Sequence, residues 1–230
     1  MIVEKIKFCL LNTAFCLIIL LANIFSAEAE QLQYLDERTL ADILANTQTA
    51  QKTNQIILVV DHNFSLWNKT TEGWWRRDME TYCGYGRNGF SANRHAGDKT
   101  TPVGAFPVLY AFGNAPNPGT ALAYKNITPY SYLSAEKSTY NTWIESAYKI
   151  SGEHLIDYYQ YKYAMNIGFN INPVIYGKGS AIFLHCKSYN RWWTSGCISL
   201  AEKDMIELLQ RSYEGEYIII VEHIADIANY

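Results

Sequence analysis

Cys197 and His185 are the two side chains whose types and spacing could carry a reaction. Cys197 lies in the segment Thr194–Ile198 (Thr-Ser-Gly-Cys-Ile), and His185 precedes it by twelve residues. A cysteine beside a histidine supplies a nucleophile together with the base that accepts its proton. The same spacing fits a core histidine with satisfied hydrogen bonds and an inert buried cysteine. The pair alone therefore leaves catalysis and simple packing open.

A helix is expected directly after the cysteine. Ser199–Glu202 (Ser-Leu-Ala-Glu) matches a capping box, and an apolar stripe follows it at Met205, Ile206, Leu208 and Leu209. A helix that starts at Ser199 would place Cys197 two residues before its N-terminus, where unpaired N–H groups and a partial positive charge favour a thiolate. Gly196 lets the backbone turn sharply, so that amides near the cysteine would face a developing oxyanion.

Strands dominate the rest of the chain. Continuous or alternating apolar patterns predict strands at 55–61, 161–171, 180–185 and 216–222. Asp36 is expected to cap a short helix, residues 46–54 to form a polar connection, and the glycine-rich residues 87–101 to form an exposed loop. These elements predict a mainly β fold with a few helices (α+β), arranged as a single domain.

Residues 1–29 have the composition of a secretory signal peptide. Lys5 and Lys7 precede an apolar run from Phe8 to Phe25, and Ala27-Glu28-Ala29 matches the small-x-small cleavage pattern. A retained N-terminal anchor is the alternative, because the run is close to the shortest membrane span. The prediction is an exported protein that lies in the periplasm, or at the outer face of the cytoplasmic membrane and cell wall. No membrane contact is expected beyond this segment.

The predicted organisation continues with a helical segment and linker at 30–54, a catalytic domain at 55–223 and a C-terminal tail at 224–230. The net charge is −3 and no basic patch stands out, so nucleic acid is not an expected partner.

Three cysteines follow the signal segment, namely Cys83, Cys186 and Cys197. An odd number in an oxidising compartment leaves at least one thiol unpaired, and catalysis is one reason for such a thiol. A disulfide between Cys186 and Cys197 is an alternative. A zinc site from His185, Cys186 and Cys197 is a weaker one, because it lacks paired C-x-x-C spacing and a fourth ligand.

Several ordered blocks resemble the L,D-transpeptidases, the YkuD-type catalytic domain. The stretch Gly97–Phe106 (GDKTTPVGAF) looks like the family's G-D-x-x-T-P-x-G-x-F segment, and His185 followed by Ser195–Ile198 (SGCI) looks like its active-site segment. Further blocks similar to one branch of the family are Ser138–Asn141, Glu153–Leu155 and Gly179–His185. The resemblance covers roughly residues 55–222 and implies a YkuD-like mixed β-sandwich.

The resemblance also implies an activity. Members of the family attack the bond between the third residue of a tetrapeptide stem and its terminal D-alanine, form a cysteine thioester, and pass the acyl group to an amine. On this chain Cys197 would be the nucleophile, His185 the base held by a backbone carbonyl, and Gly196 part of the oxyanion hole. Neither a metal nor a cofactor is expected. The side chains expected to contact the stem peptides are Ser195, Phe183, Tyr140, Asn141, Trp192 and Trp193.

Three departures from the usual motif keep other functions open. Ser195 replaces the family's second histidine, Ser199 stands where Arg or Asn is common, and Cys186 follows His185 where glycine is usual. The alternatives are an L,D-carboxypeptidase that uses water as acceptor and a non-catalytic cell-wall-binding module of the same fold. A role in cell shape or in lipoprotein attachment also stays open.

Overall fold

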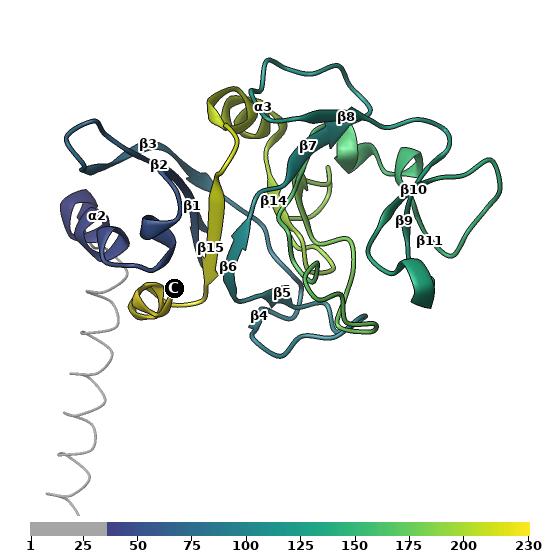
Figure 1. Ribbon diagram of the computed structural model, residues 1–230, viewed down its shortest axis with the longest axis horizontal. Coiled ribbons are helices and arrows are strands. Elements are labelled where there is room, and N and C mark those ends of the chain that lie inside the picture. Colours follow the sequence, from purple (N-terminus) through teal and green to yellow (C-terminus); the bar gives the residue numbers. More distant parts are fainter. Residues whose placement is uncertain (1–35) are drawn as a thin grey trace, which may run out of the picture. The chain divides into compact units, whose positions relative to one another are not determined.

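The computed structural model describes residues 36–230, so the predicted signal peptide lies outside the described residues. The chain divides into two units, residues 1–40 and residues 41–230. All the described β-strands belong to the second unit (Figure 1). No helix within residues 36–230 is both long and apolar enough to cross a bilayer.

Two five-stranded sheets form the framework of the second unit. The first runs in the order β3 (Trp75–Tyr82), β2 (Asn63–Lys69), β1 (Gln55–Val60), β15 (Tyr217–Val221) and β6 (Gly104–Pro107). The second runs in the order β14 (Ile198–Leu200), β13 (Phe183–Cys186), β12 (Ala164–Asn166), β7 (Tyr110–Gly113) and β8 (Tyr124–Asn126). In the first sheet β1 and β15 are parallel and the other neighbours are antiparallel.

Smaller elements complete the unit. A three-stranded sheet joins β10 (Trp143–Glu145), β9 (Ser131–Ser134) and β11 (Gly152–His154), and β4 (Phe90–Ser91) pairs with β5 (Thr101–Pro102). The two described α-helices are α2 (Glu37–Ala45) and α3 (Glu202–Arg211). Five described 3₁₀-helices are η1 (Thr49–Gln51), η2 (Lys137–Thr139), η3 (Leu155–Asp157), η4 (Tyr159–Lys162) and η5 (Ile224–Asn229).

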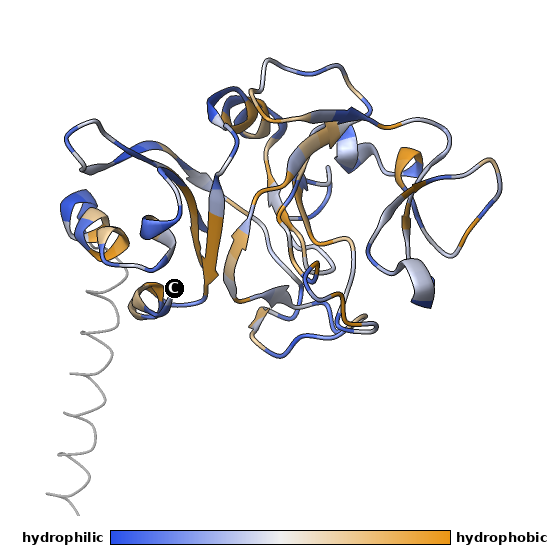
Figure 2. Cartoon of the chain, in the orientation of Figure 1, coloured by the Kyte–Doolittle hydropathy of each residue, from blue (hydrophilic) through white to orange (hydrophobic). Residues whose placement is uncertain are grey.

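Two hydrophobic clusters lie on opposite faces of the second sheet. The first cluster fills the space toward the first sheet and α3, with fully buried side chains that include Ile57, Ile218, Leu184, Ile198 and Leu208. Figure 2 shows β15 as a continuous apolar strand within this layer. The second cluster contains Phe112, Leu133, Leu155, Tyr161, Ala181, Phe183 and Cys197. Adjacent residues of one strand thus enter different cores, as expected from the period-2 alternation of side chains.

The predicted fold class, mainly β with a few helices, is confirmed. The runs at 55–61 and 216–222 correspond to β1 and β15, and Asp36 caps α2 by accepting hydrogen bonds from the N–H groups of Arg38 and Thr39 at 3.0 and 3.1 Å. Residues 224–230 are not a loose tail, because Ile227 is fully buried and the Tyr230 carbonyl accepts a hydrogen bond from Thr49.

The long strand predicted at 161–171 is wrong in length. Its first residues form η4, and β12 covers only Ala164–Asn166. The chain turns at Gly168, which has φ 62° and lies so close to Pro107 that a side chain there would clash. The alternation marks burial only in part: Met165, Ile167 and Phe169 are buried, but so are Ala164 and Asn170 of the other face, and Ile171 is exposed.

The capping box at Ser199 is also wrong. Ser199 belongs to β14, where its N–H donates to the Gly84 carbonyl and its carbonyl accepts from the Gly84 N–H, both at 2.8 Å. Its hydroxyl bonds to the Trp192 carbonyl, and α3 begins at Glu202 without a side-chain cap. Strand pairing with a distant segment thus overrides the local capping signal. Cys197 does not stand at a helix N-terminus.

Glu216 makes folding stability depend on pH. Its side chain is fully buried, the Ser212 hydroxyl donates to Oε1 at 3.3 Å, and Oε2 has no partner within the described residues. Burial raises the pKa of Glu216 from 4.5 to about 8. The folded protein therefore retains a proton that the unfolded chain releases, and this contribution to stability is lost as pH rises from 4.5 to 8.

We expect Glu216→Gln to remove this loss. Its free energy of unfolding should exceed that of the parent increasingly from pH 6.5 to 8, by up to about 1.4 kcal/mol for each pH unit. Urea unfolding at several pH values measures the difference. Above pH 6.5 the contribution of the buried His185 to the pH dependence is small, because its pKa is lowered from 6.5 to about 4. Parallel pH profiles for the two proteins would contradict the expectation.

Candidate active site

The register of β13 and β14 brings His185 and Cys197 to one face of the sheet. The strands are parallel, with Leu184 opposite Ile198 and His185 opposite Ser199. Leu184 and Ile198 enter the first core, so the alternation places His185 and Cys197 on the other face. The two side chains are diagonal neighbours across the strand pair. This is the juxtaposition that the sequence analysis predicts.

Both side chains line a pocket of about 330 Å³. Each is 8% exposed, so the reacting atoms are nearly withdrawn from bulk water. The remaining wall comes from four parts of the chain, namely the loop before β5, the segment from β11 to η4, residues 179–182 before β13, and residues 188–199 after β13. Residues from these parts include Arg94, Lys99, Glu153, Tyr161, Ser195 and Trp193.

The imidazole of His185 is held by a backbone carbonyl. Its Nδ1 lies 2.8 Å from the carbonyl oxygen of Cys186, which can only accept a hydrogen bond. The proton therefore sits on Nδ1, and Nε2 remains free to accept a proton. The ring also packs edge-on against Tyr161, with 5.6 Å between ring centroids. Burial lowers the pKa of His185 to about 4, so the imidazole is neutral at pH 7.

The thiol of Cys197 is neutral as well. Sγ donates a hydrogen bond to the Ala181 carbonyl at 3.2 Å and accepts one from the Phe183 N–H at 3.4 Å. Burial raises the pKa of Cys197 to about 12, although the Phe183 N–H opposes the shift. Within residues 36–230 no hydrogen bond joins Sγ to the imidazole. The expected resting thiolate is therefore replaced by a neutral thiol beside a neutral base.

Gly196 supplies the backbone shape of the turn before the nucleophile. Its φ is 135°, and a Cβ there would lie 2.7 Å from the Thr100 carbonyl oxygen and 3.0 Å from the Ile182 side chain. Its carbonyl accepts from the Thr101 hydroxyl at 2.9 Å, and its N–H donates to the Thr194 hydroxyl at 3.0 Å.

The predicted oxyanion hole needs a correction as a consequence. The Gly196 N–H is already engaged by Thr194, so it is not free to face a developing oxyanion. No hydrogen bond engages the Cys197 N–H among the described residues, which leaves it as the candidate donor.

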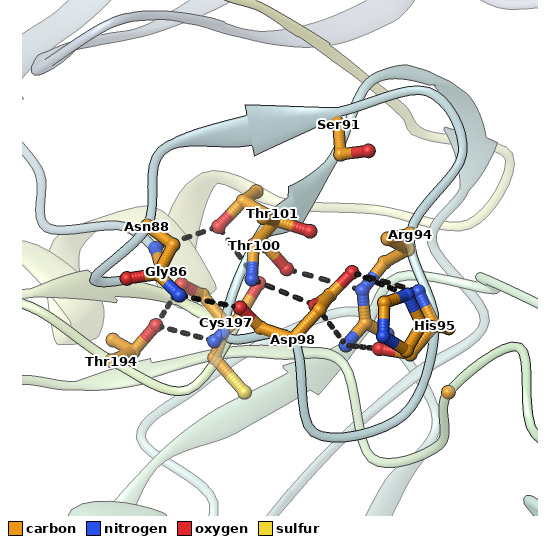
Figure 3. Close-up of polar contacts among 12 residues, drawn as sticks. Gly86, Asn88, Ser91, Arg94, His95, Asp98, Thr100, Thr101, Thr194 and Cys197 are labelled. Carbon is orange, nitrogen blue, oxygen red and sulfur yellow. Dashed lines mark hydrogen bonds and ion pairs between the residues drawn. The ribbon is translucent and has the colours of Figure 1, made fainter.

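Arg94 corrects the prediction that residues 87–101 form an exposed loop. Its side chain is buried, with Nε donating to the Thr100 carbonyl at 3.1 Å and Nη2 lying 3.5 Å from Oδ1 of Asp98 (Figure 3). Its Nη1 has no hydrogen-bond partner among the residues that the structure describes. Arg94 thus fixes the loop that packs on Gly196, and its positive charge opposes, without reversing, the rise that burial causes in the pKa of Cys197.

The predicted contact residues divide into two groups. Ser195 and Trp193 line the pocket, and Arg87 and Arg191 lie over the Trp193 ring at 5.1 and 4.4 Å. The other four do not line it, namely Phe183, Tyr140, Asn141 and Trp192. Phe183 is 1% exposed in the second core, Tyr140 is also buried, and Trp192 packs against Tyr82 on the surface.

Asn141 acts on the nucleophile through the backbone. Its Oδ1 accepts from the Ala181 N–H at 3.0 Å, and its Nδ2 donates to the Phe169 and Asn170 carbonyls. Ala181 has φ 55°, a left-handed conformation that is unfavourable for alanine. Asn141 therefore holds the residue whose carbonyl accepts the Cys197 thiol, rather than contacting a ligand in the pocket.

Two residues of the pocket wall that were not among the predicted site residues form a hydrogen-bonded pair. Glu153 and Tyr161 line the pocket, and the Tyr161 hydroxyl donates to Oε2 of Glu153 at 2.7 Å. Glu153 stands in one of the blocks that resemble the family, and that was its only signal. Tyr161 looked like an ordinary core residue of a strand.

The three described cysteines are free thiols, so the alternative disulfide between Cys186 and Cys197 is wrong. Cys186 is buried in the first core, as its packing interpretation predicts. Within residues 36–230 no group of three or more His, Cys, Asp or Glu side chains is arranged to hold a metal ion.

The neutral thiol predicts an unusual alkylation profile. We expect the rate at which iodoacetamide modifies Cys197 to keep rising with pH above 9, because the thiolate fraction is small below about pH 12. Site-resolved mass spectrometry separates Cys197 from the other thiols. A thiolate–imidazolium pair would instead give a rate that is level across neutral pH, and such a plateau would contradict the neutral resting state.

Thr101 should position the catalytic turn. Its buried hydroxyl donates to the Gly196 carbonyl and accepts from the Gly86 N–H at 2.8 Å. Thr101→Val keeps the shape but leaves two buried backbone groups unpaired, so we expect the free energy of unfolding to fall by about 2–4 kcal/mol. Thr101→Ser, the matched control, retains the hydroxyl and should keep most of that stability. Equal losses in the two variants, measured by urea unfolding, would show that the hydroxyl is unimportant.

The sequence matches the family described as L,D-transpeptidase catalytic domain (YkuD) over residues 54–221. No curated protein matches the chain.

Three solved structures illustrate the likeness in fold. The helical cell shape determining protein Pgp2 from Campylobacter jejuni has 13% identity and a TM-score of 0.43, over 82% of this chain and 56% of that one. An Enterococcus faecium L,D-transpeptidase has 13% identity and a TM-score of 0.37, over 74% and 50%. An L,D-transpeptidase from Stackebrandtia nassauensis has 13% identity and a TM-score of 0.38, over 80% and 65%.

The chain thus spans between half and two thirds of the length of these three structures. The sequence match to the family extends over most of the 230 residues. The chain belongs to the L,D-transpeptidase catalytic domain (YkuD) family.

Proposed function

We propose that this protein is a cysteine-dependent acyltransferase of peptidoglycan stem peptides, an L,D-transpeptidase. One observation carries the proposal. His185 and Cys197 line the same pocket, and the Cys186 carbonyl fixes the Nδ1 proton so that Nε2 is available as a base. A thiol and an oriented base beside a ligand-sized cavity are the parts that acyl transfer requires.

The first step is acylation of Cys197. The thiol turns from the Ala181 carbonyl toward Nε2 of His185, which takes the proton as Sγ attacks the carbonyl before the terminal D-alanine. The negative charge moves to the carbonyl oxygen, where the Cys197 N–H is the candidate donor. The imidazolium then gives its proton to the departing amine, leaving a thioester and free D-alanine. Because His185 is neutral above about pH 4, it can accept the proton at physiological pH.

The second step decides the product. An amine of a second stem attacks the thioester, His185 removes its proton, and Sγ leaves as the thiol is restored. A cross-link results. If water attacks instead, the product is a shortened stem, and the protein is an L,D-carboxypeptidase with the same two residues. Both reactions act on the cell wall, so this proposal includes export to the periplasm or the outer cell surface and a part in cell-wall biogenesis, which determines cell shape.

Mutation of the reacting pair tests the proposal. We expect Cys197→Ala to abolish turnover with the fold intact and His185→Ala to lower the rate by roughly 10²–10⁴-fold. The assay incubates reduced protein with tetrapeptide muropeptides and identifies the products by mass spectrometry. Cys83→Ala, which replaces a buried thiol in the first core, is the matched control and should remain active.

The reaction products distinguish the three candidate functions. D-Alanine release with dimer formation supports the transpeptidase, and D-alanine release alone supports the carboxypeptidase. Full activity in Cys197→Ala refutes the thiol mechanism. Binding to cell-wall material without product or acyl-enzyme would favour the non-catalytic module.

A further inference from the structure

A carboxylate shares the pocket with the reacting pair but has no part in the acyl transfer. Glu153 lies in β11, and its half-buried side chain lines the cavity with Cys197 and His185. The Tyr161 hydroxyl donates to its Oε2 at 2.7 Å. Tyr161 is itself buried and packs edge-on against His185, so it fixes the carboxylate relative to the base.

The charge of Glu153 is not compensated within the protein. Tyr161 donates its only hydrogen bond, Oε1 accepts none, and no ion pair reaches the carboxylate within the described part of the chain. Burial raises the pKa of Glu153, which reflects the cost of keeping the anion there. A desolvated carboxylate with one neutral donor is unfavourable unless a positive charge or a proton joins it.

The cations of the pocket wall do not supply that charge. The wall contains three basic side chains, Arg94, Lys99 and Arg191, and within the described residues none of them forms an ion pair with Glu153. Arg94 bonds to the Thr100 carbonyl and lies against Asp98, and Arg191 lies over the Trp193 ring. A cation that keeps Glu153 ionised would therefore come from the molecule that enters the pocket.

We propose that Glu153 binds the primary ammonium group of the peptide that occupies this pocket, through the Oε1 atom that Tyr161 leaves free. An ammonium group offers three N–H donors and one positive charge, whereas a hydroxyl or an amide would leave the anion uncompensated. The choice of a stem peptide as ligand rests on the proposed function, but the ammonium site rests on the pocket alone.

Two groups of a stem peptide have this chemistry. One is a side-chain amine on the third residue of the stem that acylates Cys197. The other is the amine of the second stem that resolves the thioester. The carboxylate would select substrate in the first case and acceptor in the second.

A binding measurement tests the ammonium site without turnover. Cys197→Ala protein is titrated with a stem tetrapeptide that has a free side-chain amine and with the same peptide acetylated on that amine. We expect the acetylated peptide to bind roughly tenfold more weakly, as for a lost charged hydrogen bond. Adding Glu153→Gln should remove the difference. Glu214→Gln, which changes an exposed carboxylate, is the matched control and should preserve it.

Kinetics of the single Glu153→Gln variant then assign the amine. Slower acyl-enzyme formation places the amine on the donor stem. Normal acylation with slower cross-linking places it on the acceptor. Tyr161→Phe should slow the same step as Glu153→Gln, but by less, because it frees the carboxylate without removing it.

Equal affinities for the free and acetylated peptides, or no binding by either, would overturn the ammonium site. That result is separable from failure of the proposed function. A parent protein that forms an acyl-enzyme but shows no preference for the amine refutes only Glu153. A parent protein that shows the preference but never acylates refutes only the transferase.

Discussion

The parallel pairing of β13 with β14 is the interaction on which the site depends. It sets Cys197 diagonally to His185 and sends their neighbours Leu184 and Ile198 into the opposite core. A shift of one residue in this register would turn the thiol into the first core and away from the base. The bridges between Ser199 and Gly84 add a third segment that resists such a shift. The reacting pair is therefore positioned by sheet pairing.

Burial of the site changes the pKa values of both Cys197 and His185. The same desolvation that packs Cys197 among Phe183 and Tyr161 raises the pKa of the thiol, and it lowers the pKa of His185. Both side chains are consequently neutral at pH 7. Fixed dipoles then matter more than they would in water, because the low-polarity surroundings screen them weakly. The Cys186 carbonyl is one such dipole, because its hydrogen bond with Nδ1 of His185 orients it toward the imidazole.

The sequence was informative about burial and about local chemistry, and less so about what distant segments do to each other. Continuous apolar patterns identify β1 and β15, and the spacing of His185 and Cys197 predicts two side chains that do line one pocket. The capping box at Ser199 failed because Gly84, over a hundred residues earlier, takes the backbone groups of that serine. For the same reason the burial of Arg94 could not be predicted, because its sequence neighbours are polar and glycine-rich. It also left Asn141 looking like a contact residue, although its partner Ala181 is forty residues away.

The position of Ser199 explains one departure from the family's usual motif in physical terms. Ser199 is 1% exposed, with its hydroxyl on the Trp192 carbonyl and its backbone paired with Gly84, so the serine at this position joins three segments. A positive charge near Cys197 comes from Arg94, whose Nη2 lies 3.4 Å from where a Gly196 Cβ would stand. Because this guanidinium is bound to the loop that holds the turn, one side chain influences both the shape of the turn and the electrostatics of the thiol. The backbone of the turn thus couples the position of this guanidinium to the position of Cys197.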